Sequence, residues 1–391
     1  MDGSMKFTWM LHLATLAFFL GLMIISPIIS PFSIALGASP LIVGLLSSLS
    51  SMVAIIGRPL SGLLSDRGRK FETLMLGGVL GCSAAFVYVS SNNLWLFALG
   101  RILHGFASAS FMPASISTAI DLSPIGRVGE TLGWRSTMFG ISQLFGPGLG
   151  GYLAELYGFI PTFLVALFLS FISLVIVYLT RRSVPKSLVT HVSEKRNVIQ
   201  DFKKLLRPNF LGAMAAVSFH AIGTSAIFTF LPAFYGSVGL GTGAYGLFAS
   251  VQGGSSILTR ATSGKFADRR GPIPIASLGA ILMTIAYILL NFFSLPPLSL
   301  ISASIFGIGM GLWVPSIQLF ALGKLDPEVR GFGSGIYSMA FDFGFLVGPI
   351  FFGYLIEVTS GYLYMFLSLP FFTVGALLVI QVVSFLIRRR G

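Results

Sequence analysis

Residues 62–70 read GLLSDRGRK, and residues 264–271 read GKFADRRG. Each stretch ends a long apolar run and places a glycine and an aspartate before a cluster of basic residues. The two aspartates, Asp66 and Asp268, lie 202 residues apart. Related stretches separated by about half of the chain predict an internal repeat.

The same offset of 202 residues recurs along six apolar runs, where it relates Arg58 to Arg260, Pro113 to Pro315 and Glu155 to Glu357. Chance does not keep one register over such a length. We therefore predict two homologous six-helix bundles, at residues 1–181 and 209–391. Between them, residues 182–208 are predicted to form a linker that carries a short amphipathic helix on the membrane surface.

Composition places most of the chain in lipid. Of 391 residues, 54% are apolar and 10% are charged, whereas soluble domains carry about 25% charged residues. Apolar runs of about 20 residues recur, the length that a helix needs to cross a bilayer. We predict an all-α integral membrane fold with twelve spanning helices, at residues 8–30, 41–64, 71–90, 94–120, 128–153, 160–180, 209–235, 243–266, 272–293, 297–322, 328–355 and 361–387.

The basic residues fix the expected orientation. The net charge is +12, but the Lys and Arg residues outside the spans all fall on one side, and the opposite loops contain none. Short cytoplasmic loops hold the basic residues of membrane proteins. We therefore expect a multi-pass protein of the cell (plasma or inner) membrane with both termini in the cytoplasm, and we expect no nucleic-acid partner.

The two quoted stretches resemble the signature loop between helices 2 and 3 of the major facilitator superfamily. The resemblance implies a transporter that works by alternating access, with a substrate site near the midplane between two bundles. It also implies that the aspartate of the loop accepts hydrogen bonds from the start of helix 11, near Glu328. The gating residues assigned in this way are Gly62, Asp66, Arg67, Gly68, Arg69, Gly264, Asp268, Arg269 and Gly271, together with Arg127 in the next basic loop.

Two further motifs resemble those of the same family. Arg101, followed by His104 and Gly105, resembles a helix-4 motif, which implies proton coupling or substrate anchoring; a structural tie of Arg101 to the backbone is the alternative. The glycines and proline of the fifth span resemble the antiporter signature of drug exporters and favour export, with ordinary helix packing as the alternative. These hinge-motif residues are Gly133, Gly146, Pro147, Gly150 and Gly151, with Gly335, Gly344, Gly348 and Pro349 in the repeat.

Few charges lie inside the predicted spans. Asp342 lies roughly 20 Å from the cytoplasmic end of its helix, so it can load and release a proton as its exposure alternates. A permanent pair with Arg58 is the alternative. Arg135 and Arg260, on helices that are neighbours in the family, indicate an anionic group between them, or else separate partners.

The leading hypothesis is proton-coupled efflux of amphipathic small molecules, in a cavity lined by Phe19, Phe111, Phe228, Trp313 and Tyr337 as well as Arg58, Arg135 and Arg260. The alternative is transport of an anionic or zwitterionic solute, and a non-transporting receptor is the least favoured. Four scattered histidines and one cysteine match no metal or catalytic pattern, so we expect no enzyme and no cofactor. The expected partners are a small-molecule substrate, protons and the bilayer, and the expected state is a monomer.

Overall fold

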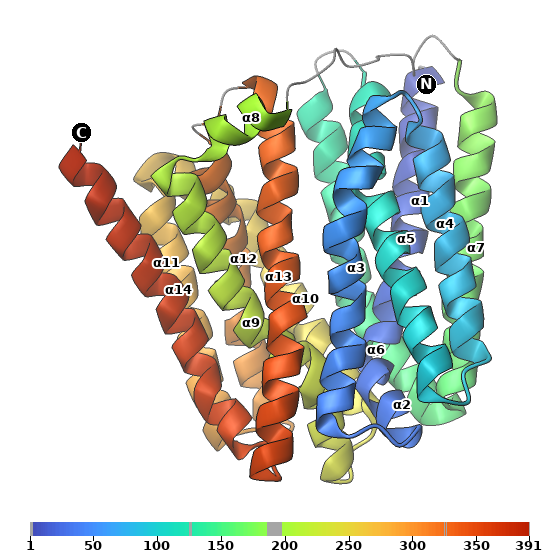
Figure 1. Ribbon diagram of the computed structural model, residues 1–391, viewed down its shortest axis with the longest axis vertical. Helices are drawn as coiled ribbons and strands as arrows, with labels where there is room; N and C mark the ends of the chain where they lie inside the picture. The colour runs from blue at the N-terminus through green and yellow to red at the C-terminus, as the bar shows by residue number, and fades with distance from the viewer. Residues whose placement is uncertain (1–2, 125–126, 186–197, 324, 326, 391) are drawn as a thin grey trace. The chain divides into compact units, whose positions relative to one another are not determined.

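The computed structural model describes residues 3–124, 127–185, 198–323, 325 and 327–390. Within these ranges the chain is helical and contains no strand. Twelve of its helices have twenty residues or more (Figure 1). This confirms the predicted all-α membrane fold.

The long helices follow the predicted spans closely. Those of the first half are α1 (Gly3–Ile25), α3 (Pro40–Asp66), α4 (Lys70–Val89), α5 (Leu94–Asp121), α6 (Val128–Tyr157) and α7 (Phe159–Ser183). Those of the second half are α9 (Pro208–Ser237), α10 (Thr242–Arg270), α11 (Pro272–Phe292), α12 (Ser299–Leu322), α13 (Pro327–Thr359) and α14 (Leu363–Arg390).

The first span differs from its prediction. α1 ends at Ile25, a single 3₁₀ turn, η1, occupies Ser26–Ile28, and α2 continues over Ile29–Ala35. Proline lacks a backbone N–H and its ring clashes with the preceding turn, so Pro27 interrupts the α-helical hydrogen bonding. The span thus reaches five residues beyond the predicted end at residue 30.

Ten described helices are long and apolar enough to cross a membrane. The two long helices outside that set are α6 and α10, whose counterparts in the repeat are α13 and α3. α6 carries Glu130, Arg135 and Glu155 among many glycines, and the last part of α10 is strongly basic. Their length is sufficient to span a bilayer; their glycine and charge content lowers their hydropathy.

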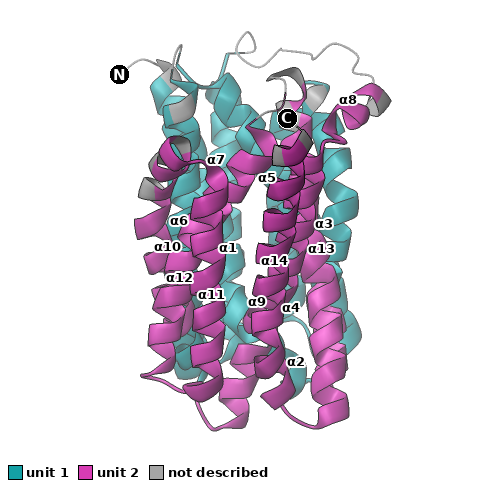
Figure 2. Cartoon of the chain, turned by 90° about the vertical axis from the view of Figure 1, so that its left-hand side faces the viewer, with its two compact units in different colours: residues 1–38, 49–195, 241–246 teal, residues 39–48, 196–240, 247–391 magenta. Residues whose placement is uncertain are grey.

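The chain divides into two compact units (Figure 2). Unit 1 comprises residues 1–38, 49–195 and 241–246, and unit 2 comprises residues 39–48, 196–240 and 247–391. α3 therefore begins in unit 2 and continues in unit 1, whereas α10 begins in unit 1 and continues in unit 2. The predicted boundary at residues 182–208 stays a prediction, since residues 186–197 lie outside the described part.

Each unit is held together by aromatic packing and by close helix approach. In unit 1 the rings of Phe18 (α1) and Phe111 (α5) stack with centroids 3.9 Å apart. In unit 2, α11 and α12 approach at Gly279 and Gly309, where a Cβ on either residue would lie within 2.8 Å of the other's carbonyl oxygen. Small residues at helix contacts allow this approach and the dispersion contacts that stabilise membrane bundles.

The short helix α8 (Val198–Leu205) precedes α9. Its last residue, Leu205, is buried, and the side chain packs against Gly333 of α13. Phe202 and Leu206 are exposed. Leu205 thus joins this helix to α13.

Candidate functional site

Arg135 is buried in unit 1 and is tied to α5. Its Nε donates to Ser115 Oγ at 2.9 Å, and its Nη2 donates to the same oxygen at 2.7 Å and to the carbonyl of Met112 at 3.2 Å. A guanidinium in a membrane bundle needs such partners, because desolvation of an unsatisfied charge is costly. These contacts orient Arg135 toward α5, and its predicted role in anion binding stays a prediction.

A small recess lies near Arg135, at the end of unit 1 where α1 begins. It has a free volume of about 50 Å³ and is lined by Met5, Thr8, Trp9, His12, Pro124, Arg127, Glu130, Thr131 and Trp134. The indole rings of Trp9 and Trp134 lie 5.0 Å apart, and the ring of His12 meets that of Trp9 edge-on at 5.6 Å. His12 Nδ1 is buried and has no hydrogen-bond partner among the described residues. The recess therefore combines the aromatic faces of two tryptophans with the ring of a histidine.

Glu130 and Arg127 form the polar rim of this recess. Arg127 Nε and a carboxylate oxygen of Glu130 are 3.8 Å apart, and both side chains are more than half exposed. Exposed pairs of this kind contribute little to stability, so either group can turn toward a ligand at small cost. Arg127, predicted as a gating residue, thus borders the recess.

Arg101 lies within a polar cluster of unit 1. It interacts electrostatically with Tyr88 and His104, whose ring centroids are 6.3 Å apart. Its carbonyl accepts a hydrogen bond from Ser50 Oγ of α3 at 2.9 Å. The structure therefore brings Arg101 and His104 together, as their spacing on one helix face predicts, and adds Tyr88, which the sequence analysis did not select.

The other predicted intramembrane charges are distributed over both units. Asp342 is buried on α13 of unit 2, with 7% of its surface exposed. In unit 1, Arg58 Nη1 lies 3.7 Å from the sulfur of Met112. Arg260 Nε on α10 is buried without a hydrogen-bond partner among the described residues. Because Arg58 and Asp342 belong to different units, their pairing stays a prediction.

The predicted cavity aromatics lie in the interior of their units. Phe19 contacts Phe111 and Phe139 edge-on, and Trp313 lies 5.8 Å from His220 in unit 2. Phe228 and Tyr337 are half-buried. Phe111 and Trp313 are fully buried, so they face a substrate only if neighbouring side chains move.

The glycines of the hinge motif separate into two groups. A Cβ on Gly146 or Gly150 of α6 would collide with Met23 or Ile24 of α1, and a Cβ on Gly344 or Gly348 of α13 would collide with α9. In contrast, Gly133 and its counterpart Gly335 have open space around them. The motif therefore provides a close helix contact in each unit, and only part of it requires glycine for space.

The gating loop of the first half turns at Gly68, which has a φ of 79°, and the second turns at Gly271, which has a φ of 85°. Such positive φ values favour glycine. Arg67, Arg69 and Arg269 are exposed. The side chains of Asp66, Asp268 and Glu328 lie outside the described part, so the predicted contact with helix 11 is not tested.

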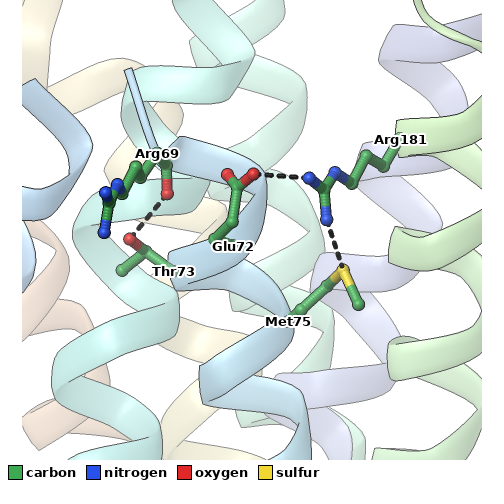
Figure 3. A network of polar contacts seen from close by, with 5 residues as sticks. All are labelled: Arg69, Glu72, Thr73, Met75 and Arg181. Atoms are coloured by element: carbon green, nitrogen blue, oxygen red, sulfur yellow. Dashed lines mark hydrogen bonds and ion pairs between the residues drawn. The ribbon is translucent and has the colours of Figure 1, made fainter. Parts of the chain in front are cut away.

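Next to this loop, a polar network that the sequence analysis did not predict joins α4 to α7 (Figure 3). Arg181 donates to Glu72 at 2.5 Å and contacts the sulfur of Met75 at 3.8 Å, and Thr73 Oγ1 donates to the carbonyl of Arg69. Lys70, the last basic residue of this loop motif, is buried and pairs with Asp121 at the end of α5. Adjacent basic residues in sequence gave no signal to separate Lys70 from Arg69.

The chain is similar in sequence to a known protein family and to individual bacterial proteins. The family model described as Major Facilitator Superfamily matches residues 11–349. Multidrug resistance protein 1 of Bacillus subtilis (strain 168) is 24% identical over 353 residues, which cover 89% of each chain. Multidrug resistance protein MdtG of Salmonella paratyphi A is 27% identical over 320 residues, which cover 78% of this chain and 76% of the relative.

Solved structures show similarity of fold at low sequence identity. The nucleoside transporter NupG aligns with a TM-score of 0.73 and 15% identity over 98% of this chain and 99% of its own. The human organic anion transporter MFSD10 aligns with a TM-score of 0.69 and 16% identity over 97% and 100%. At these identities the similarity concerns the fold alone, and it includes transporters of quite different solutes.

Proposed function

The chain belongs to the Major Facilitator Superfamily of transporters, and from that premise we propose that it exports amphipathic small molecules in exchange for protons. The observation that carries this proposal is the recess of unit 1, where Trp9, Trp134 and His12 combine aromatic faces with a polar atom. Ligand sites are typically apolar and aromatic with few polar groups. The names of the multidrug resistance relatives support the same substrate class.

The size of the recess limits what it holds. A volume of about 50 Å³ is far below the roughly 300–1,000 Å³ of a drug-sized pocket. We therefore infer that the recess receives one aromatic or methylated end of the substrate, stacked on Trp9 and Trp134. Glu130 on the rim favours a cationic group there.

Proton coupling is assigned to Asp342. Its carboxylate is buried on α13, and ionisable side chains within membrane spans mark ion pathways and proton relays. Arg101 and His104 are the further candidates for this role. The substrate and the coupling ion are separate parts of the proposal and are tested separately.

Tryptophan fluorescence of the full chain in detergent tests the substrate class. We expect tetraphenylphosphonium to quench the fluorescence with saturation, and we expect Trp9→Phe to weaken the apparent affinity. Trp95, which is 87% exposed at the start of α5, supplies the matched control Trp95→Phe, which leaves the affinity unchanged. Equal effects of the two substitutions would contradict binding at the recess.

Transport of an anionic or zwitterionic solute is the second candidate. It is favoured by Arg260, whose buried Nε lacks a hydrogen-bond partner among the described residues, and by the buried guanidinium of Arg135. A ligand of the folded state raises the melting temperature. Stabilisation by benzoate that is lost in Arg260→Ala, without any effect of tetraphenylphosphonium, would replace the first proposal by the second.

A further inference from the structure

The starts of α3 and α10 are each capped by a glutamate from another helix. Glu357 of α13 accepts hydrogen bonds from the backbone N–H of Leu41 at 3.0 Å and from the hydroxyl of Ser39 at 2.7 Å. Glu155 of α6 accepts a hydrogen bond from the backbone N–H of Gly243 at 2.8 Å. The first four N–H groups of a helix lack partners within the helix, and a carboxylate there also interacts favourably with the helix dipole.

The two caps correspond in the repeat. Glu155 and Glu357 are 202 positions apart, and so are Leu41 and Gly243. We call the contacts of Glu357 the α3 cap and the contact of Glu155 the α10 cap. In both caps, the accepting glutamate lies in the last turns of a long helix. The donating backbone N–H belongs to the second residue of the capped helix. The α3 cap lies in unit 2 and the α10 cap lies in unit 1.

Glycines hold the helices of each cap close together. In unit 2, a Cβ on Gly353 would lie 2.6 Å from the carbonyl oxygen of Pro40, and a Cβ on Gly44 would collide with the backbone of Pro349. In unit 1, a Cβ on Gly151 would lie 2.5 Å from the carbonyl oxygen of Thr242, and a Cβ on Gly246 would lie 2.6 Å from the carbonyl oxygen of Pro147. The four glycines form two pairs with the 202-residue offset, so each cap stands beside a backbone contact that leaves no room for a side chain.

The capped helices are those that the two units share. Residues 40–48 of α3 belong to unit 2 and the rest of the helix belongs to unit 1, and α10 is divided in the opposite sense. When one unit moves relative to the other, either the two shared helices bend or their caps open. Alternating access in such transporters proceeds largely by rigid-body rocking of the halves.

We propose that Glu155 and Glu357 are gating residues. Their two caps keep the helix ends on the side opposite the basic loops closed, and both caps open together during the transport cycle. The proposal requires neither a particular substrate nor a particular coupling ion, so it is independent of the proposed export function. It assigns a role in transport to two carboxylates that lie outside the motifs of the sequence analysis.

Cysteine accessibility tests the proposal in the full chain, reconstituted in liposomes. The reporter is Val43→Cys, a buried position in the first turn of α3, in a Cys82→Ala background. We expect Glu155→Gln and Glu357→Gln each to raise the labelling rate by a maleimide by about two- to fivefold, the range expected for one charge at a helix N-terminus. The double variant is expected to exceed either single variant.

A second variant disturbs the α10 cap without removing a charge. A Cβ at Gly241 would collide with the carboxylate of Glu155, so Gly241→Ala is expected to act in the same direction as Glu155→Gln. Gly236→Ala, at a glycine with open surroundings on α9, is the matched control and leaves the labelling rate unchanged. Asp201→Asn on α8 controls for the loss of a negative charge.

The melting temperature and the elution profile of each variant establish that it is folded. Unchanged labelling in folded Glu155→Gln, Glu357→Gln and Gly241→Ala variants would overturn the proposal, because the caps would then be static helix ends. An equal increase in the Gly236→Ala control would overturn it as well. If ligand binding at the recess fails while labelling responds as expected, the proposed substrate is wrong and the gating role stands.

Discussion

Asp342 lies between two phenylalanines in the sequence of α13, and its carboxylate is the group on which the proposed proton coupling depends. Its neighbours in sequence are Phe341 and Phe343, both partly exposed on the outside of the helix, whereas Asp342 itself is buried. A side chain on the buried face of a spanning helix changes its surroundings when the helix packing changes. A side chain that takes up and releases one proton during transport requires such a change of surroundings.

Asp342→Asn is expected to abolish accumulation driven by a pH gradient in liposomes, because the amide does not exchange a proton. Counterflow of substrate between equal concentrations needs no net proton movement and is expected to persist. The two assays are run on the same preparation. Retained uphill transport in the variant would show that the coupling group is elsewhere.

Lys70 and Asp121 allow a stability prediction at the same scale. Their side chains are only 8% and 9% exposed, whereas the neighbouring pair Arg181–Glu72 is 45% and 46% exposed. Removing one partner of a buried pair costs about 3–5 kcal/mol, because a buried charge is left without compensation. Exposed pairs contribute about 0–1 kcal/mol.

We therefore expect Asp121→Asn to lower the melting temperature of the purified protein clearly, and Glu72→Gln to change it little. The double variant Lys70→Met with Asp121→Leu removes both charges and is expected to recover most of the loss. A similar small effect of Asp121→Asn and Glu72→Gln would mean that Lys70 reaches water.

At the scale of the element, the sequence predicted the positions of the long helices well, since apolar length and the loop motifs mark each span. It did not predict where α1 breaks, although Pro27 is visible. It also treated the hinge glycines as one class. Whether Gly133 or Gly150 touches another helix depends on the partner face, and no pattern within α6 contains that information. The same limit applies to Lys70, whose partner lies 51 residues away.

α6 offers an internal comparison of its glycines. Gly150→Ala places a methyl group against the backbone of Ile24 and is expected to destabilise the protein by about 1–3 kcal/mol, as overpacking does. Gly133→Ala meets open space and replaces glycine by the best helix former, so it is expected to be neutral or slightly stabilising. Melting temperatures of the two variants measure the difference. A loss in Gly133→Ala as large as that in Gly150→Ala would contradict the contacts described for α6.

For the whole molecule, the distribution of Lys and Arg predicts the orientation in the membrane. In a Cys82→Ala background, Asn92→Cys, between α4 and α5, is expected to react with an impermeant maleimide in intact cells. Arg67→Cys, between α3 and α4, is expected to react only after permeabilisation. If Arg67→Cys reacted in intact cells and Asn92→Cys reacted only after permeabilisation, the protein would have the opposite topology. The direction of transport would then have to be reassigned.

The division of α3 and α10 between the units also bears on how such a chain arose. Had the ancestor been a six-helix protein that paired with a second copy of itself, a single glutamate per copy would have formed both caps through an isologous, two-fold contact. Duplication and fusion of the gene would then leave two copies free to diverge. The extra hydroxyl of Ser39, where the repeat has Gly241, would be such a divergence, because it gives the α3 cap a second hydrogen bond.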